Sequence, residues 1–555
     1  MNKKKIAYLL LSAAVVALPS ACYDDDSTFA DGHIKDVTIN SSDSSVLYVN
    51  YLDELDINPV INRGEPSDTA GLTYKWQISE GTSASTSQEW IDLGNEPSLH
   101  AVINNEINSR PYDLCLTVTD NSNGGLQYRK WWSVYVRSSF LDGIAVADTR
   151  DGATSDLNLI MGKNLTLNYD GQKDKVMHDI LQKATGKPYD KPITALTYNA
   201  QGYMSMTHVN NLWAVSDDGD LALYNLKDFS QTARLSQGGI LTYMPDGIKV
   251  LKVFSAGMQY IMLNTNQYFY STNSINNSNF GWYDTGGGQY PIDNNVVMAT
   301  SSKYDYQLVM WYDAKDGCFV EGNPNPMSNN SLAYDTDIAA NSYFDPQHMS
   351  GYTALTADES VDGSVPAFLL RNNADGSYAI YTFVRHMSRQ GEWNDDGTEF
   401  TETSPEIPAS ARMKYDIPAE GKALIDKAVS VFFAANQAIL YVATPAGIYT
   451  INFAGAQATV NATPVFTPAS GETITKAKLY RQGVDMQDQS MLTGGNYAEL
   501  PLNRKAVMVA TQSSEYEGKL SLVPMKQIGT GNLDASSAQT WTGFGKILDF
   551  CTTAY

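Results

Sequence analysis

Carboxylate side chains are the first candidates for chemistry in this 555-residue chain. Asp148, Asp151 and Asp156 lie in one short segment, and calcium prefers oxygen ligands of this kind. Their spacing is not that of an EF-hand loop, because the glycine and the terminal glutamate are misplaced. Asp-Gly at Asp151-Gly152 is also typical of a hairpin turn, where glycine adopts the left-handed conformation at little cost. We favour the turn and expect no metal ion and no cofactor.

A second acidic group lies around Trp393: Glu392 directly precedes it, and Asp395 and Asp396 follow it. Most glycosidases use a pair of carboxylates, so a surface hydrolase is one hypothesis. Adjacent acids before a glycine are more typical of a solvated turn. The histidines show no ligand spacing, and no Gly-x-Ser-x-Gly elbow occurs. We therefore predict that the protein is not an enzyme.

Aromatic side chains in polar loops give the best indication of ligand binding. Trp282 and Tyr283 lie in a glycine-rich segment, and Trp393 lies in a long polar loop. Exposed rings of this type offer flat faces to sugar rings or peptide side chains. For Trp282 and Tyr283, packing inside the fold is an equally good interpretation.

The N-terminal residues predict export. Lys3, Lys4 and Lys5 precede an apolar run that ends at Leu18, so residues 1–21 read as a signal peptide. No later apolar run approaches the roughly 20 residues of a membrane helix. The formal net charge of −23 disfavours nucleic acids and anionic membrane surfaces as partners.

Cys22 follows the predicted cleavage site. The small residues before it resemble the lipobox of bacterial lipoproteins, in which the cysteine becomes the lipid-carrying first residue; Pro19 stands where a leucine is usual. Asp24, Asp25 and Asp26 resemble the acidic signal that directs Bacteroides-type lipoproteins to the outer face of the outer membrane. This resemblance implies a lipid-anchored acidic tether over residues 22–35 and contact with the membrane through lipid alone.

Residues 36–138 have the pattern of an immunoglobulin-like β-sandwich. Alternating runs at Leu72–Ile78 and Tyr112–Asp120 place Trp76 and other apolar side chains on one face. Asn121–Gly125 is expected to be the hairpin turn that leads into the strand Leu126–Val136.

Residues 139–555 repeat one pattern seven times: an apolar run, a polar turn and a second alternating run. Such hairpins cannot bury their own apolar faces, and radial stacking would bury them in a β-propeller, with seven blades expected and six or eight still open. A helix is expected near Lys173–Ala184, and the run Trp541–Phe550 is expected to complete the first blade. The copies are Ile144–Ile160, Leu212–Tyr224, Tyr260–Tyr270, Gln307–Val320, Ala367–Phe383, Ala438–Phe453 and Ala506–Val523.

The strand Leu114–Asp120 resembles the Leu-Thr-Val-Thr-Asp strand of PKD domains. Together with Cys22, its acidic tail and the order of the parts, it makes the chain similar to the PKD-like family of Bacteroidota surface lipoproteins. That resemblance implies a TonB-dependent outer-membrane transporter and its substrate-binding lipoprotein as partners, as in starch-utilisation-like systems. It also implies an accessory role in capturing glycan or peptide nutrients at the cell exterior. The alternatives are a glycoside hydrolase or lyase with a propeller active site, and a purely structural subunit of the transporter.

Overall fold

The structure is a computed structural model that describes residues 35–554 with gaps, and it divides into two compact units. The first unit takes residues up to 48, 54–101 and 109–135, and the second takes 49–53, 102–108 and the rest of the chain. The gaps are residues 65–67, 84–88, 109, 139, 141, 170, 202–208, 242–243, 257–259, 274–282, 285–291, 293–296, 300–308, 323–333, 336–337, 388, 395 and 484–496. The chain is all-β, as predicted, and no helix among the described residues is long and apolar enough to cross a membrane.

The first unit is built on a five-stranded antiparallel sheet with the order β2-β9-β8-β5-β6. Its buried face carries Trp76, whose ring lies 5.3 Å from that of Trp132. The predicted turn at Asn121–Gly125 joins β8 to β9, with Gly124 and Gly125 at positive φ. Two further pairs are β1-β4 and β3-β7. The strands are β1 (Val37–Asn40), β2 (Val46–Asn50), β3 (Glu54–Ile57), β4 (Val60–Arg63), β5 (Leu72–Thr82), β6 (Trp90–Gly94), β7 (Leu99–Val102), β8 (Tyr112–Asp120) and β9 (Leu126–Arg137).

The described part of the second unit contains seven four-stranded antiparallel sheets in chain order. Each predicted copy forms the two middle strands of one sheet. The first four sheets are formed by β39 (Lys546–Thr553), β10 (Gly143–Thr149), β11 (Asp156–Met161) and β12 (Lys175–Met177); by β13 (Ile193–Gln201), β14 (Val209–Ser216), β15 (Leu221–Asn225) and β16 (Gln231–Arg234); by β17 (Val250–Ala256), β18 (Tyr260–Thr265), β19 (Phe269–Asn273) and β20 (Tyr283–Asp284); and by β21 (Val297–Ala299), β22 (Val309–Asp313), β23 (Cys318–Gly322) and β24 (Tyr334–Asp335).

The last three sheets follow the same plan. They are formed by β25 (Tyr352–Ser360), β26 (Val365–Asn372), β27 (Tyr378–Val384) and β30 (Ser410–Asp416); by β31 (Ser430–Phe433), β32 (Ile439–Thr444), β33 (Gly447–Asn452) and β34 (Thr459–Phe466); and by β35 (Thr473–Leu479), β36 (Ala506–Ser514), β37 (Glu517–Pro524) and β38 (Gln539–Phe544). The hairpin β28 (Gln390–Trp393) and β29 (Phe400–Ser404) is inserted between β27 and β30.

Helices are short. The helices α2 (Ile180–Thr185) and α3 (Ala419–Ile425) are accompanied by 3-10 turns at Asn121–Asn123, Leu235–Gln237, Tyr497–Glu499 and Ala535–Ser537. The helix predicted at Lys173–Ala184 is only half correct. Lys175–Met177 is the strand β12, which pairs with β11 and gains the edge hydrogen bonds of the first sheet.

Neighbouring sheets bury each other's faces. Apolar clusters join the second sheet to the third, the third to the fourth, and so on to the seventh. Another cluster joins the seventh sheet to the first, where Leu520 and Trp541 pack with Ile144 and Phe550. The first sheet packs on the seventh through this cluster and contacts β13 of the second sheet, and every residue of β10 and β11 is buried.

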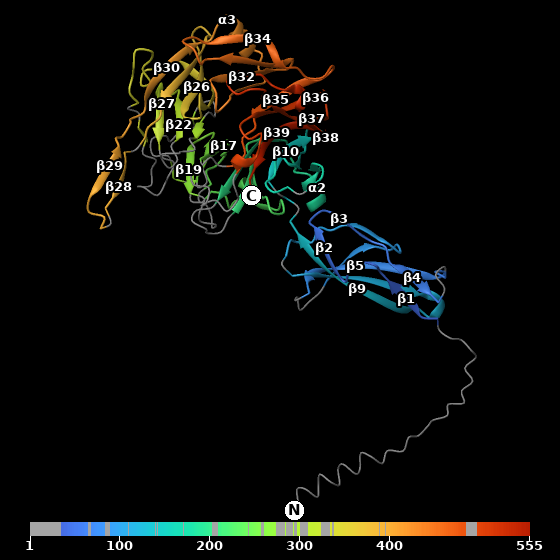
Figure 1. Cartoon of the computed structure of the whole chain (residues 1–555). Coiled ribbons are helices and arrows are strands. Elements are labelled where there is room, and N and C mark those ends of the chain that lie inside the picture. Colours follow the sequence, from blue (N-terminus) through green and yellow to red (C-terminus); the bar gives the residue numbers. More distant parts are fainter. Residues whose placement is uncertain are drawn as a thin grey trace, which may run out of the picture. The chain divides into compact units, whose positions relative to one another are not determined.

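The C-terminal strand closes the first sheet. β39 pairs with β10, as Figure 1 shows for the red and teal strands, so residues nearly 400 positions apart are hydrogen-bonded neighbours. The preceding strand β38 pairs with β37 in the seventh sheet. The chain end therefore links the first and last sheets.

Candidate functional site

The binding residues predicted from the sequence fall mostly outside the described residues. This holds for Cys22, Asp24, Asp25, Asp26 and Trp282, and for the side chains of Tyr283 and Trp393. The backbone of Tyr283, in β20, pairs with that of Ser271 in β19, and the backbone of Trp393 pairs with that of Phe400 across the β28-β29 hairpin. Trp311 and Tyr312, by contrast, are buried in the core.

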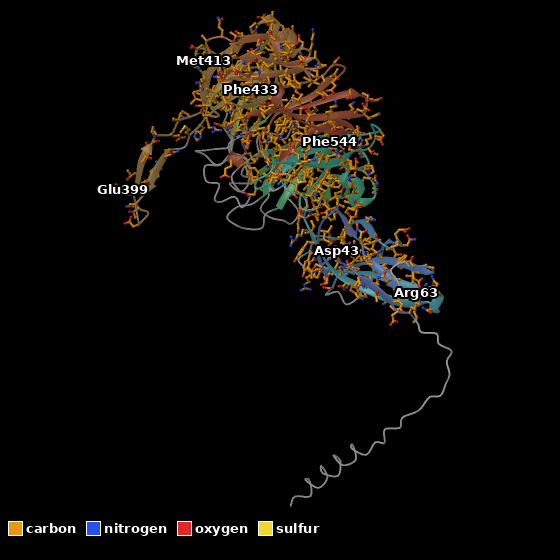
Figure 2. All side chains as sticks on the ribbon, turned by 45° about the vertical axis from the view of Figure 1, so that its right-hand side comes forward. Asp43, Arg63, Glu399, Met413, Phe433 and Phe544 are labelled. Atoms are coloured by element: carbon orange, nitrogen blue, oxygen red, sulfur yellow. The ribbon has the colours of Figure 1, made fainter. Side chains whose placement is uncertain are left out.

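The β28-β29 hairpin extends away from the fifth sheet, and Figure 2 labels Glu399 near its tip. Glu392 and Asp396, two acids considered for a glycosidase, are exposed there, and Asp395 lies outside the described residues. Asp396 accepts hydrogen bonds from the hydroxyl and the amide of Thr398, and these bonds lower the pKa of its carboxyl group. These contacts are those of a turn.

A cavity of about 330 Å³ lies beside the turn between β10 and β11. It is lined in part by Asp148, Arg150, Asp156, Asp179 and Gln182. Asp148 accepts from the side-chain amide of Asn158 at 2.8 Å and from the amide of Gly545 at 2.5 Å.

The other two aspartates considered for calcium also serve backbone groups. Asp151 accepts from the amides of Ala153 and Thr154, both at 2.8 Å, and these bonds lower its pKa to about 2. Asp156 accepts from Leu181 at 2.7 Å and Gln182 at 2.9 Å, in the first turn of α2. The carboxylate oxygens therefore organise the turn and the helix start.

Edge strands of three sheets bring four charged side chains together. Asp549 of β39 is 3% exposed and accepts from the ammonium groups of Lys476 at 3.0 Å and Lys478 at 2.6 Å. Its second oxygen accepts from the amide of Leu196 in β13 at 2.8 Å. Lys252 of β17 interacts electrostatically with the same three side chains. We call Lys252, Lys476, Lys478 and Asp549 the lysine cluster.

The electrostatics of the lysine cluster are unbalanced. The two ion pairs hold the pKa of Asp549 well below its usual range although burial opposes its charge. Burial, together with repulsion by Lys478 and Lys476, lowers the pKa of Lys252. The structure thus brings three ammonium groups around one carboxylate.

A second charged group links the fifth and seventh sheets. Glu359, 1% exposed at the end of β25, accepts from Arg385 and Arg481, both at 3.0 Å, and Arg504 lies 4.0 Å from it. Asp358 accepts from the other amino group of Arg481 at 2.9 Å. We call this set the arginine cluster.

Neither cluster was identified from the sequence. A usable signal is present, because Thr475-Lys476-Ala477-Lys478 alternates charge with apolar residues, and Asp549 interrupts an apolar terminal run. Alternation of this kind shows that one face of a strand is polar. It does not show that polar faces from three distant sheets meet.

Comparison with known proteins identifies the N-terminal region only. A model of the PKD-like family matches residues 22–192, which include β1 to β9 and extend through α2. The match begins at Cys22 and ends before β13. No curated protein matches the chain.

Proposed function

We propose that the second unit is a seven-bladed β-propeller that captures a nutrient ligand at the bacterial surface. Face-to-face packing of successive sheets, including the seventh on the first, supports a single ring. A terminal strand paired into the first sheet is the usual device by which such a ring avoids open edges.

The observation that carries the binding role is the lysine cluster. Asp549 is buried and a buried charge is costly, but one cation would compensate it, whereas three lysines gather around it. Here the first, third and seventh sheets each supply one or two of these charged side chains from an edge strand. A polar centre within a rigid apolar framework is the usual construction of a ligand site.

The remaining parts of the proposal concern location and partners. The lipobox-like residues before Cys22 and the acidic residues after it are the basis for proposing a lipoprotein displayed on the outer membrane. In that setting the protein would pass a glycan or peptide to a TonB-dependent transporter and its substrate-binding lipoprotein. Lipid at Cys22 would be its contact with the membrane, and aromatic side chains such as Trp282, Tyr283 and Trp393 would contact the cargo.

One experiment separates capture from catalysis. The purified mature chain is incubated with oligosaccharide and peptide pools, bound material is recovered, and the pools are analysed by chromatography and mass spectrometry. We expect selective retention of some components and no new products. Appearance of shortened products would refute the non-enzymatic role.

A surface hydrolase is the second candidate, and the arginine cluster is the observation that favours it. Acids and arginines from two sheets do converge there. Both carboxylates, however, already accept hydrogen bonds from Arg481, whereas a glycosidase needs one carboxyl group that carries a proton. Product formation that is lost in an Asp358→Asn variant would establish this candidate.

A further inference from the structure

The lysine cluster has more positive charge than its own residues neutralise. Lys476 and Lys478 each donate to Asp549 and to one main-chain carbonyl, of Leu548 and Phe550 respectively, both at 2.8 Å. An ammonium group has three N–H donors, so each of these lysines keeps one. Lys252 has no hydrogen-bond or ion-pair partner among the described residues.

An excess of positive charge is unusual for this acidic chain. The whole protein has 61 acidic and 38 basic residues, yet three lysines meet a single aspartate here. The single negative charge of Asp549 cannot neutralise three ammonium groups, and it already pairs with Lys476 and Lys478. Burial is the main cause of the lowered pKa of Lys252, and repulsion by Lys478 and Lys476 adds to it; a bound anion would relieve that repulsion.

The cluster is also accessible. The side chains of Lys476 and Lys478 are 28% and 34% exposed, and Lys252 is half-buried. β13 contacts both β39 and β17. The amide of Leu196 in β13 donates to Asp549, and the hydroxyl of the next residue, Thr197, donates to the carbonyl of Val253 in β17 at 3.1 Å, which places Lys252 near Asp549. Solvent, and hence a ligand, reaches the partly exposed side chains of Lys476 and Lys478.

Strand edges beside the cluster are already occupied. Peptides commonly bind as an added strand, through free main-chain groups at a sheet edge. Here the carbonyls of Leu548 and Phe550 accept from the two lysines, and the amide of Leu196 donates to Asp549. A peptide that binds as an added strand would have to displace these side-chain partners from the main-chain groups. A sugar acid needs only the N–H donors that the lysines keep.

We propose that the lysine cluster binds the oxyanion group of an acidic oligosaccharide, with Lys252 as its principal charge partner. This assignment rests on the proposed capture function and names its cargo class. Ammonium groups are compact point charges that bind oxyanions and sugar hydroxyls alike. The site is the polar centre described above, and the aromatic loops would hold the neighbouring sugar rings.

Calorimetric titration of the full mature chain tests the proposal. The probes are trigalacturonate, sulfated trisaccharide, maltotriose, tri-aspartate and inorganic sulfate. We expect trigalacturonate or the sulfated sugar to bind at least tenfold more tightly than maltotriose and tri-aspartate. Raising the salt concentration should weaken this binding, because charge attraction contributes to it.

Variants locate the binding site. Lys252→Met should lower the affinity for the acidic sugar at least tenfold, and Lys252→Arg should retain most of it. Because Lys252 has no partner among the described residues, its removal leaves the pairs of Asp549 intact, and thermal unfolding of the variant verifies this. Lys546→Met, an exposed position on β39, is the matched control and should bind like the parent chain.

The outcomes distinguish the inference from the capture function. Equal binding of maltotriose and trigalacturonate, or an unchanged affinity in Lys252→Met, overturns the anion site and leaves capture standing. Tighter binding of tri-aspartate overturns the sugar assignment. If only inorganic sulfate binds, and does so through Lys252, the anion site is real but glycan capture is refuted.

Discussion

Asp156 shows at the scale of one residue how a carboxylate can support a fold that disfavours its charge. It accepts from the amides of Leu157, Leu181 and Gln182, which links β11 to the first turn of α2. Burial nevertheless outweighs these bonds and raises its pKa to about 6. The folded protein therefore holds the proton of Asp156 more tightly than the unfolded chain does.

This difference predicts the effect of pH on stability. The unfolded pKa of an aspartate is about 4, so the contribution of Asp156 is present below pH 4 and is lost as pH rises through about 6. The Asp156→Asn variant does not titrate. The unfolding free energy of the parent minus that of Asp156→Asn should therefore fall between about pH 4 and 6.5, by up to about 3 kcal/mol. Urea denaturation across this range measures it.

Asp151 serves as a control for Asp156, because its pKa is shifted in the opposite direction. Its pKa is lowered to about 2, so its contribution is present above about pH 4 and is lost as pH falls toward 2. The Asp151→Asn variant should differ from the parent in pH dependence only below pH 4. A pH-independent difference for Asp156→Asn would contradict the account of that residue.

Glu359 carries a second prediction at the residue scale. Its carboxylate is buried and accepts from two arginines, with a third 4.0 Å away. Removing one partner of a buried ion pair leaves uncompensated charge and costs about 3–5 kcal/mol. We expect Glu359→Gln to lower the unfolding free energy by about this amount, whereas Glu399→Gln on the exposed hairpin should change it by less than about 0.5 kcal/mol. Equal stabilities would show that solvent compensates the arginines.

At the scale of elements, the sequence predicted where the strands lie better than it predicted which strands pair and which side chains from different sheets come together. Seven apolar runs joined by polar turns were sufficient to locate seven hairpins, because a period of two residues is a local property. The strand β12 was missed, since Lys175-Val176-Met177 is short and its edge position depends on β11. The lysine cluster was missed because Lys252 and Asp549 become neighbours only through the order of the sheets.

The C-terminal strand β39 allows a test of how the sheets depend on one another. Ending the chain after Gly545 removes Ile547 and Phe550 from the core and leaves Lys252, Lys476 and Lys478 without Asp549. Loss of large core side chains costs about 2–5 kcal/mol each. We expect this truncation to abolish cooperative unfolding of the second unit, measured by calorimetry.

The hairpin β28-β29 provides the matched deletion. Its strands pair with each other and with no strand of the fifth sheet among the described residues. Replacing residues 390–404 by a short Gly-Ser linker should therefore leave the unfolding transition nearly unchanged. A large loss of stability in this variant would show that the hairpin contributes to the core.

At the scale of the whole molecule, the net charge bears on how the chain could be held at a membrane. A chain with a net charge of −23 is repelled by anionic membrane surfaces, so a covalent anchor would have to supply its membrane affinity. The small residues before Cys22, which resemble a lipobox, make that residue the proposed anchor. We therefore expect the Cys22→Ala variant to leave the membrane fraction of expressing cells, because it lacks the thiol that would carry the lipid.

Fractionation followed by mass spectrometry of the N-terminal peptide measures this change. Cys318→Ala is the control, since that thiol is buried and unpaired with another cysteine in the described residues, so its loss should leave the protein in the membrane fraction. A single acyl chain binds membranes only marginally, so stable retention of the parent chain implies more than one lipid chain on Cys22. Retention of Cys22→Ala would show instead that a protein partner holds the chain at the membrane, which would favour a structural subunit of the transporter over a lipid-anchored capture protein.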